Sequence, residues 1–315
     1  MPVFPLNHII EAQQFDRDIL ERVFRTADKM KADLADALAG KRQFAKALDG
    51  KIMASLFYEP STRTRFSFES AMLRLGGSVI TTENAREFSS VAKGESLSDS
   101  IRIINGYADV IVMRHNEAGS AAKAAAISHI PVLNAGDGAG QHPTQALLDI
   151  YTISDAFSGI QGLKIAMVGD LRYGRTVRSL CYLLTKYNPV EIIFVSPPVC
   201  RMEADIKDYL DKHSVPWREE DDLDQVVPVA DCIYMTRVQK ERFHDPEDYK
   251  IAASQYVLTP KRVSAMKKDA IIMHPLPRVN EIPDTVDDDP RQRYFDQAKN
   301  GLYIRMALLY LLLVR

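Results

Sequence analysis

The chain has 315 residues, more than one hydrophobic core usually organises, so two domains of roughly 150 residues each are expected. Its 46% hydrophobic and 26% charged residues are typical of a globular protein and exclude a disordered or fibrous class. The formal charge of -2, without a long block of one sign, argues against a nucleic acid or an anionic membrane as partner.

Three further features bear on the cellular compartment. The chain has three cysteines, namely Cys181, Cys200 and Cys232. They lack the spacing of a zinc site or a redox pair, which indicates reduced, buried thiols in a cytoplasmic protein. Residues 1–7 lack the features of a signal peptide. The apolar run 302–314 contains Arg305 and falls short of the roughly 20 residues that a membrane span needs, so it predicts a buried closing helix.

In the first half of the chain, helical and strand patterns alternate. Residues 16–39 carry apolar side chains at helical spacing and predict the first helix. The apolar run 52–57 predicts a strand that passes through a turn into a helix at 66–75. Similar short runs, each followed by a turn and helical spacing, lie at 79–82, 110–113 and 132–133.

The second half repeats this alternation, with predicted strands at 164–169, 191–195, 231–235 and 270–273. The whole pattern predicts an α/β fold of two doubly wound parallel-sheet domains. We expect one domain at residues 1–141, completed by a C-terminal helix at 294–315, and the other at 142–293. Ligands bind beyond the carboxyl ends of parallel strands, so the active site is expected in the cleft between the domains.

The motif STRTR at 61–65 stands where a strand ends and a helix begins. Free backbone N–H groups at a helix N-terminus, hydroxyl groups and a guanidinium fork would together coordinate a phosphate. The alternative is a serine N-cap followed by surface arginines. Three hydroxyls and two arginines within five residues favour the phosphate site.

Three later features are ambiguous on their own. Residues 89–95 form a polar, glycine-bearing loop whose Lys93 is solvated by default. Arg114 follows the strand at 110–113 and either reaches the same anion or lies on the surface. His142 and Gln145 share one face at a helix start, where a histidine is either structural or a hydrogen-bond donor to a developing oxyanion.

The turn at 169–176 matches the spacing of a nucleotide-binding P-loop, except that Arg175 replaces the lysine. A planar arginine fork binds a carboxylate through two hydrogen bonds, whereas a P-loop lysine acts as a compact point charge on phosphate. This difference favours a carboxylate ligand, with nucleotide binding as the alternative.

Two more strand ends carry polar groups. Arg237 and Gln239 belong to the motif TRVQKER at 236–242, and HPLPR at 274–278 exposes the carbonyl groups of Leu276 and Pro277 as acceptors for N–H groups. No nucleophile with its base, carboxylate pair or metal cluster is recognised in the sequence. We therefore expect no cofactor and no metal, and catalysis by positioning and charge stabilisation.

Seven motifs resemble those of the aspartate carbamoyltransferase family in order and spacing, over almost the whole chain. They are STRTR at 61–65, SSVAKGE at 89–95, MRH at 113–115, HPTQALLD at 142–149, GDLRYGRTVRSL at 169–180, TRVQKER at 236–242 and HPLPR at 274–278. The resemblance implies transfer of the carbamoyl group of carbamoyl phosphate to L-aspartate, an early step of pyrimidine biosynthesis.

The resemblance also implies that the domain at 1–141 binds carbamoyl phosphate and the domain at 142–293 binds aspartate. It gives the following residue roles on the carbamoyl phosphate side. Its phosphate would be held by Ser61, Thr62, Arg63, Thr64 and Arg114, with Arg63 stabilising the leaving group. His142, Thr64 and Arg114 would lie at the carbamoyl oxygen. Gln145 and the carbonyl of Leu276 would bind the carbamoyl NH₂ group.

On the aspartate side, the resemblance implies that Arg175 and Arg237 clamp the two carboxylates, with Gln239 in support. Leu276, Pro277 and Lys93 would also bind aspartate, and Lys93 would be catalytic as well. It further implies a cis peptide bond between Leu276 and Pro277. Ser89 and Lys93 would come from the neighbouring chain of a homotrimer, which places the active site at a subunit interface. Association with regulatory chains or a dihydroorotase is left open.

Two other functions compete with this one. Ornithine carbamoyltransferases share the STRTR and HPTQ motifs but resemble a pattern with HCLP and SMG, whereas this chain has HPLPR and TRVQKER. Arginines suit the second carboxylate of aspartate and would repel the ornithine ammonium. A non-catalytic scaffold is the other alternative, and the intact motifs argue against it.

Overall fold

The computed structural model describes residues 3–41, 43–85, 94–238, 249 and 254–314. The chain divides into two compact units, each with its own parallel sheet. Unit 1 comprises Met1–Leu147 and Lys299–Arg315, and unit 2 comprises Leu148–Ala298. Helices α6 (Pro143–Phe157) and α12 (Tyr294–Leu313) each contain one point of division. The predicted fold class, two parallel-sheet α/β domains, is confirmed, while the assignment of each domain to a substrate stays a prediction.

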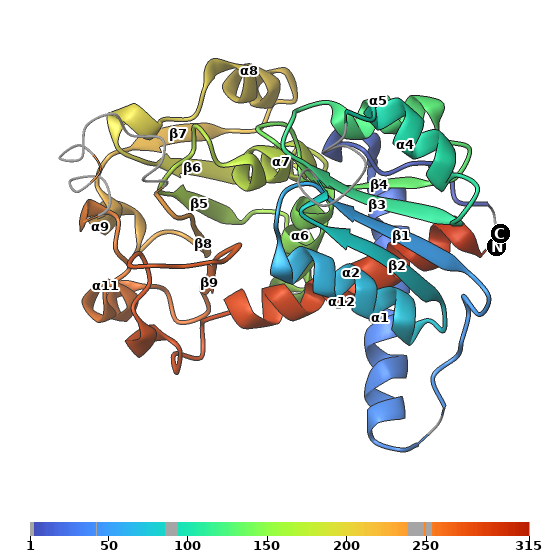
Figure 1. Ribbon diagram of the computed structural model, residues 1–315. Helices are drawn as coiled ribbons and strands as arrows, with labels where there is room; N and C mark the ends of the chain where they lie inside the picture. The colour runs from blue at the N-terminus through green and yellow to red at the C-terminus, as the bar shows by residue number, and fades with distance from the viewer. Residues whose placement is uncertain (1–2, 42, 86–93, 239–248, 250–253, 315) are drawn as a thin grey trace. The chain divides into compact units, whose positions relative to one another are not determined.

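Unit 1 contains a sheet of four parallel strands in the order β2-β1-β3-β4. Its strands are β1 (Ile52–Phe57), β2 (Ser78–Glu83), β3 (Val110–His115) and β4 (Val132–Asp137). Its other elements are η1 (Ala12–Gln14), α1 (Arg17–Leu38), α2 (Thr62–Arg74), α4 (Leu97–Ile104) and α5 (Ser120–Ile127). In Figure 1, α4 and α5 lie on one side of this sheet and α2 and α12 on the other.

The two faces of this sheet follow the alternation of side chains along its strands. Ala54 and Leu56 of β1 pack with Ile101 of α4 in one buried cluster. Ser55 points the other way, and its hydroxyl donates to Glu69 Oε1 of α2 at 3.0 Å. A strand buried on both faces explains why β1 is apolar in sequence apart from Ser55.

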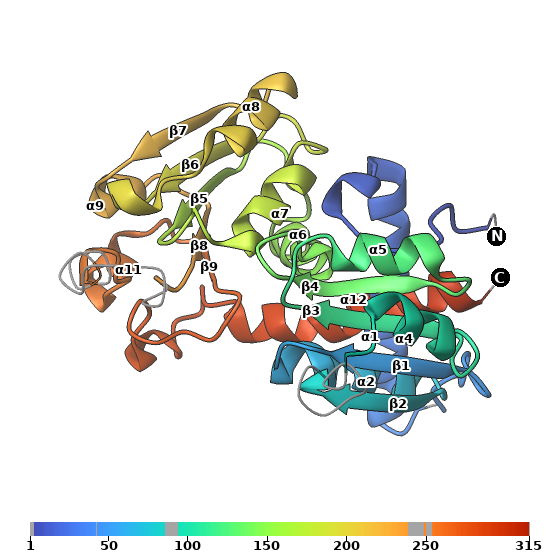
Figure 2. The same cartoon turned by 45° about the horizontal axis from the view of Figure 1, so that its top comes forward.

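Unit 2 contains five parallel strands in the order β7-β6-β5-β8-β9, which can be followed in Figure 2. They are β5 (Lys164–Val168), β6 (Glu191–Val195), β7 (Trp217–Glu220), β8 (Cys232–Met235) and β9 (Ile271–Met273). Its other elements are α7 (Arg175–Leu184), η3 (Pro198–Cys200), α8 (Ala204–Lys212), α9 (Leu223–Val226), α11 (Pro260–Ala265) and η5 (Asp284–Val286). Only β7 had no counterpart among the predicted strands, because it is a polar edge strand with the sequence WREE.

The three cysteines are free and buried, in agreement with the sequence prediction. Burial raises the pKa of the Cys200 thiol to about 12, which leaves that group protonated near neutral pH. The closing helix is present as α12, and most of its C-terminal half is buried. Among the described residues, no helix combines the length and the apolar character that crossing a bilayer requires.

Candidate active site

The first group of predicted residues lies together at the N-terminus of α2 and the end of β3. Ser61 is the N-cap of α2 in an extended conformation, and its side chain makes no capping hydrogen bond. Thr64, in the first turn, is buried. We call Ser61–Thr64 together with Arg114 the anion cradle. Its backbone N–H groups at a helix N-terminus and its hydroxyls suit a phosphate.

Arg63 and Arg114 bring two positive charges close together. Burial, and then the like charge of Arg114, lower the pKa of the Arg63 guanidinium. An arginine nevertheless keeps its proton near neutral pH. Two guanidinium groups that repel each other create a local positive potential, which a bound dianion would relieve. The repulsion itself therefore supports an anion site.

Arg114 is held by a residue that was not predicted. Its Nη2 atom donates to Glu59 Oε1 at 2.7 Å, and its Nη1 atom donates to the carbonyl of Ala135 at 3.4 Å. Its Nε atom is buried and has no hydrogen-bond partner among the described residues. Glu59 thus orients the guanidinium while Nε remains a donor. The signal for Glu59 was an acidic residue immediately before Pro60 at the end of β1.

Arg65 has a different role from Arg63, although both belong to STRTR. Its Nη1 atom donates to Glu83 Oε2 at 2.6 Å, and its Nε atom lies 3.6 Å from Glu69 Oε1. Thr81 donates to the same Glu69 oxygen at 2.7 Å. Arg65 therefore joins α2 to β2, whereas Arg63 lies in the anion cradle.

His142 and Gln145 are placed by a glycine-bearing turn between β4 and α6. Asp137 Oδ1 accepts from the backbone N–H of Gln141 at 2.8 Å, which closes the turn. Gly138 has a φ of +51°, and a Cβ there would lie 2.4 Å from the carbonyl oxygen of Asn116. A residue with a side chain would displace this turn. Both His142 and Gln145 are buried beside the first turn of α6, as their predicted shared face requires.

In unit 2, Arg175 and Arg237 lie at the carboxyl ends of neighbouring strands. Arg175 begins α7 after β5, Arg237 follows β8, and β5 pairs with β8. Thr236 and Gly169 bring the two strand ends together, because a Cβ at Gly169 would lie 2.5 Å from the Thr236 carbonyl oxygen. Both arginines are partly exposed. Two guanidinium forks at one sheet edge suit a ligand with two carboxylates.

Leu276 and Pro277 lie in the next connection, after β9. The peptide bond between them is cis, as expected, and Leu276 has a φ of +55°. His274 holds this segment, because its Nδ1 atom accepts from the Leu276 N–H at 2.7 Å and its Nε2 atom lies 2.8 Å from Glu281 Oε1. We call residues 274–281 the proline turn. Its backbone conformation depends on side-chain contacts.

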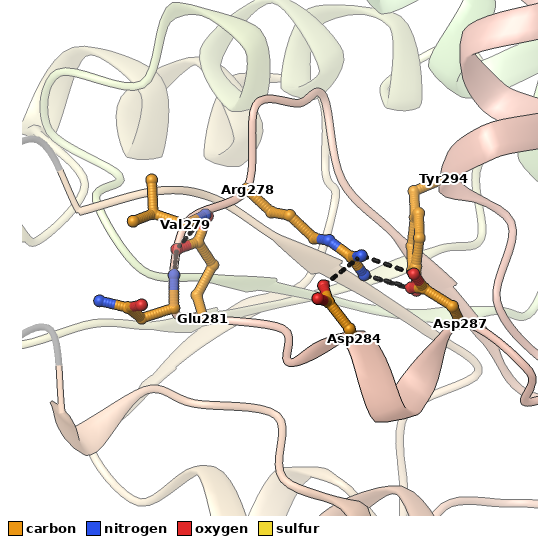
Figure 3. A network of polar contacts seen from close by, with 7 residues as sticks. Arg278, Val279, Glu281, Asp284, Asp287 and Tyr294 are labelled. Atoms are coloured by element: carbon orange, nitrogen blue, oxygen red, sulfur yellow. Dashed lines mark hydrogen bonds and ion pairs between the residues drawn. The ribbon is translucent and has the colours of Figure 1, made fainter.

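Glu281 closes the proline turn from its far end, as Figure 3 shows. Its Oε2 atom accepts from the backbone N–H groups of Val279 and Asn280 at 3.2 and 3.1 Å. Burial alone would raise the pKa of Glu281, but the hydrogen bond and charge of His274 hold that pKa below its ordinary value. The carboxylate is therefore charged near neutral pH and fixes His274 with its Nε2 atom protonated.

Arg278, the last residue of HPLPR, serves the structure of unit 2. It forms ion pairs with Asp287 and with Asp284 Oδ1, the latter at 2.8 Å, and its Nη1 atom donates to Tyr294 Oη at 3.0 Å. Figure 3 shows its guanidinium directed at these three side chains. The contacts anchor the middle of the proline turn to η5 and α12.

Three predicted site residues, Ser89, Lys93 and Gln239, lie outside the described residues. The others form two groups, one within each unit. The anion cradle with His142 and Gln145 belongs to unit 1, and Arg175, Arg237, Leu276 and Pro277 belong to unit 2. Among the described residues, no three or more His, Cys, Asp and Glu side chains are arranged to hold a metal ion.

Comparison with known proteins matches both units to one family. Residues 7–155 match the carbamoyl-P binding domain of aspartate/ornithine carbamoyltransferases, and residues 161–312 match the Asp/Orn binding domain. A chloroplastic aspartate carbamoyltransferase of Oryza sativa subsp. japonica is 56% identical over 98% of this chain and 85% of its own length.

Solved structures give the same result. The catalytic subunit of M. jannaschii aspartate transcarbamoylase is 48% identical, with a TM-score of 0.90 over 98% of each chain. Aspartate transcarbamoylase from Trypanosoma cruzi in complex with carbamoyl phosphate and aspartate is 39% identical, with a TM-score of 0.89 over 98% of this chain and 97% of that one. The chain belongs to the aspartate/ornithine carbamoyltransferase family.

Proposed function

We propose that this chain is an aspartate carbamoyltransferase, which transfers the carbamoyl group of carbamoyl phosphate to the amino group of L-aspartate. The observation that carries the proposal is the adjacency of Arg63 and Arg114 at the N-terminus of α2. Relatives that are 46–57% identical over nearly the whole chain are named aspartate carbamoyltransferases.

In the proposed reaction, the neutral amine of aspartate attacks the carbamoyl carbon. The bond between that carbon and the phosphate oxygen breaks, and inorganic phosphate leaves. His142, Thr64 and Arg114 would donate hydrogen bonds to the carbamoyl oxygen, where negative charge develops. Arg63 would stabilise the departing phosphate, which accepts the proton lost by the amine. Fixed cations would thus lower the barrier without a side-chain nucleophile or base.

The other substrate contacts are part of the same proposal. The phosphate would be bound by Ser61, Thr62, Arg63, Thr64 and Arg114. Gln145 and the carbonyl of Leu276 would receive the carbamoyl NH₂ group. The two carboxylates of aspartate would be bound by Arg175 and Arg237, with Gln239 and Pro277 beside them.

Formation of N-carbamoyl-L-aspartate and phosphate from the two substrates tests the activity directly. Ornithine in place of aspartate tests specificity, and we expect no carbamoyl transfer to it. Two guanidinium groups at the ends of β5 and β8 would repel the ornithine ammonium. Transfer to ornithine at a comparable rate would contradict the proposed specificity.

We also propose that the active site is shared between chains of a homotrimer, with Ser89 and Lys93 supplied by a neighbour. Purified Arg63→Ala and Lys93→Ala proteins should each be nearly inactive. When their chains are mixed and exchanged, some hybrid trimers would contain an intact site and recover activity. No recovery despite demonstrated chain exchange would exclude a shared site. Mass measurement in solution would test the trimer and any regulatory chain or dihydroorotase.

The proposed compartment is the cytoplasm, in keeping with three free, buried cysteines. The plastid is the alternative, because relatives from rice, Pisum sativum and Arabidopsis thaliana are named chloroplastic. Fractionation of source cells, followed by an assay for carbamoyl aspartate, would distinguish the two. N-carbamoyl-L-aspartate would be an early intermediate of pyrimidine biosynthesis. Deletion of the gene should then stop growth, and added uracil or uridine should restore it.

A further inference from the structure

The fully buried carboxyl group of Asp149 has no role in the reaction described above. Asp149 lies on α6, at the end of the motif HPTQALLD, with 0% of its surface exposed. A buried carboxylate is costly unless several hydrogen bonds compensate for the loss of water. Asp149 must therefore be compensated by hydrogen bonds within unit 2.

Asp149 accepts hydrogen bonds from two different segments of unit 2. Its Oδ1 atom accepts from Gln297 Nε2 of α12 at 2.6 Å. Its Oδ2 atom accepts from the hydroxyl of Tyr234 of β8 at 2.7 Å. Both donors are buried. One carboxylate thus joins α6 to α12 and to the central part of the sheet.

The first of these contacts continues to the proline turn. Gln297 Oε1 accepts from the backbone N–H of His274 at 2.9 Å. His274 in turn accepts from the Leu276 N–H and contacts Glu281. The donor group of the Gln297 amide is bound by Asp149, so the amide oxygen is directed at His274. Asp149 therefore sets the orientation of the amide that holds the start of the proline turn.

The second contact reaches the two arginines. Tyr234 lies on β8, three residues before Arg237, which follows that strand. Its hydroxyl also hydrogen-bonds Thr176, next to Arg175 at the start of α7. Burial and then the charge of Asp149 raise the pKa of Tyr234 well above its ordinary value, so its hydroxyl stays protonated as a donor. Two short side-chain links therefore connect Asp149 with the segments that carry Arg175 and Arg237.

We propose that Asp149 is a positioning residue for aspartate, which holds the proline turn, the end of β8 and the start of α7 in one register. The inference rests on the proposed function, because those three segments carry Leu276, Pro277, Arg237 and Arg175. A carboxylate suits this position because it accepts from Tyr234 and Gln297 at once, whereas an asparagine amide would direct its NH₂ group at one of the two donors. Displacement of any segment moves a ligand of aspartate and leaves the anion cradle in place.

The test compares Asp149→Asn, Tyr234→Phe and Gln297→Met with the unmodified protein. Tyr256→Phe is the matched control, because Tyr256 is equally buried in unit 2 but donates to the backbone carbonyl of Asp221 at 3.0 Å. We measure KM for aspartate, kcat and the equilibrium Kd for inorganic phosphate, which would contact the anion cradle and not Leu276. Since a displacement of about 1 Å can cost on the order of 100-fold, we expect a rise of at least about tenfold in aspartate KM for the three variants.

A purely structural role predicts a different pattern. If Asp149 served only stability, binding of inorganic phosphate would weaken along with that of aspartate, or the control would change equally. We expect instead that the Kd for inorganic phosphate, and the aspartate KM of the control, stay within about twofold of the unmodified protein. An unchanged aspartate KM in Tyr234→Phe and Gln297→Met would overturn the proposal, even if Asp149→Asn failed to fold.

A second readout does not depend on catalysis. Amide hydrogen exchange of the peptide 274–281, measured without substrates, should be faster in Asp149→Asn and Gln297→Met and unchanged in Tyr256→Phe. If the unmodified protein forms no carbamoyl aspartate, the proposed function fails while hydrogen exchange still tests the positioning role. Unchanged exchange in both variants would overturn that role even in an active enzyme.

Discussion

The anion cradle and the proline turn both follow a parallel strand, yet they are held in different ways. The cradle uses the N-terminus of α2, so its donors are backbone N–H groups and side chains close in sequence. The proline turn has an unusual backbone, with Leu276 at a φ of +55°, and depends on His274, Glu281 and Gln297. The proposed phosphate site is thus encoded locally, whereas the proposed amino-acid site depends on contacts between distant segments.

The comparison explains how one family can keep one substrate and change the other. A helix N-terminus binds any phosphate that reaches it, and altering it would remove the shared chemistry. The segments that carry Arg175, Arg237 and Leu276 are three separate connections, whose side chains and positions can change one at a time. The family of this chain is named for both aspartate and ornithine, which fits one shared substrate and one that differs.

The largest expected effect follows from removing charge in the anion cradle. Arg63→Ala should lower kcat by about 10³-fold, because a fixed donor to the developing negative charge is lost. Steady-state kinetics at saturating substrates checks this. Arg65→Ala is the matched control, two residues away but bound to Glu83. It should keep most of kcat and cost about 1 kcal/mol of stability. An equal loss of kcat in both variants would contradict the separate roles of Arg63 and Arg65.

A smaller effect is expected from the carboxylate side of the comparison. Arg175→Ala should raise the KM for aspartate by about 100-fold through loss of a charge-assisted pair, with binding of carbamoyl phosphate unchanged. Arg178→Ala is the control on the same helix, because Arg178 pairs with Asp205 and Glu203. Titration with each substrate separately provides the measurement. Weaker carbamoyl phosphate binding in Arg175→Ala would contradict the separation of the anion cradle from the residues proposed to bind aspartate.

The turn that holds His142 offers a test through the backbone. Gly138→Ala should lower the free energy of unfolding by about 3 kcal/mol, since a left-handed φ is combined with a clash against the Asn116 carbonyl. Gly119→Ala has a φ of +81° but open space around its Cβ, so it should cost only about 1 kcal/mol. Urea denaturation of both variants measures the difference. Equal costs would show that the turn accommodates the clash.

The smallest effect concerns the anchor of the proline turn and depends on pH. The hydrogen bond from Arg278 is the main cause that holds the pKa of Asp287 below its ordinary value. The carboxylate therefore adds stability above the unfolded-state pKa of about 3.9, and this stability is lost as pH falls through the lower folded-state pKa. Near neutral pH, Arg278→Ala should be about 1 kcal/mol less stable than the unmodified protein. Below about pH 4 this difference should shrink, because Asp287 becomes protonated and no longer pairs with Arg278.

Thermal unfolding at a series of pH values measures this difference. The gap in Tm between Arg278→Ala and the unmodified protein should narrow as the medium becomes acidic. A gap that stayed constant down to the acid transition would indicate that Arg278 acts through packing against Tyr294, over whose ring it lies at 5.1 Å, and not through Asp287.

The amino-acid sequence by itself determined the local features of this protein. Apolar runs bounded by turns predicted β1, β3, β5, β6, β8 and β9, because a strand covered on both faces must be apolar throughout. The motif at 61–65 predicted a helix N-terminus with clustered donors, because capping and helix polarity depend on adjacent residues. The polar edge strand β7 gave no such signal.

The tertiary structure alone decided which of the polar residues work together. Glu59 on Arg114, Glu83 on Arg65 and Asp149 between Tyr234 and Gln297 join residues 18 to 148 positions apart. No periodicity or spacing indicates such pairs, since hydrogen bonds depend on distance in space and not along the chain. The different roles of Arg63 and Arg65, two residues apart on α2, depend on the partners that the fold brings to each.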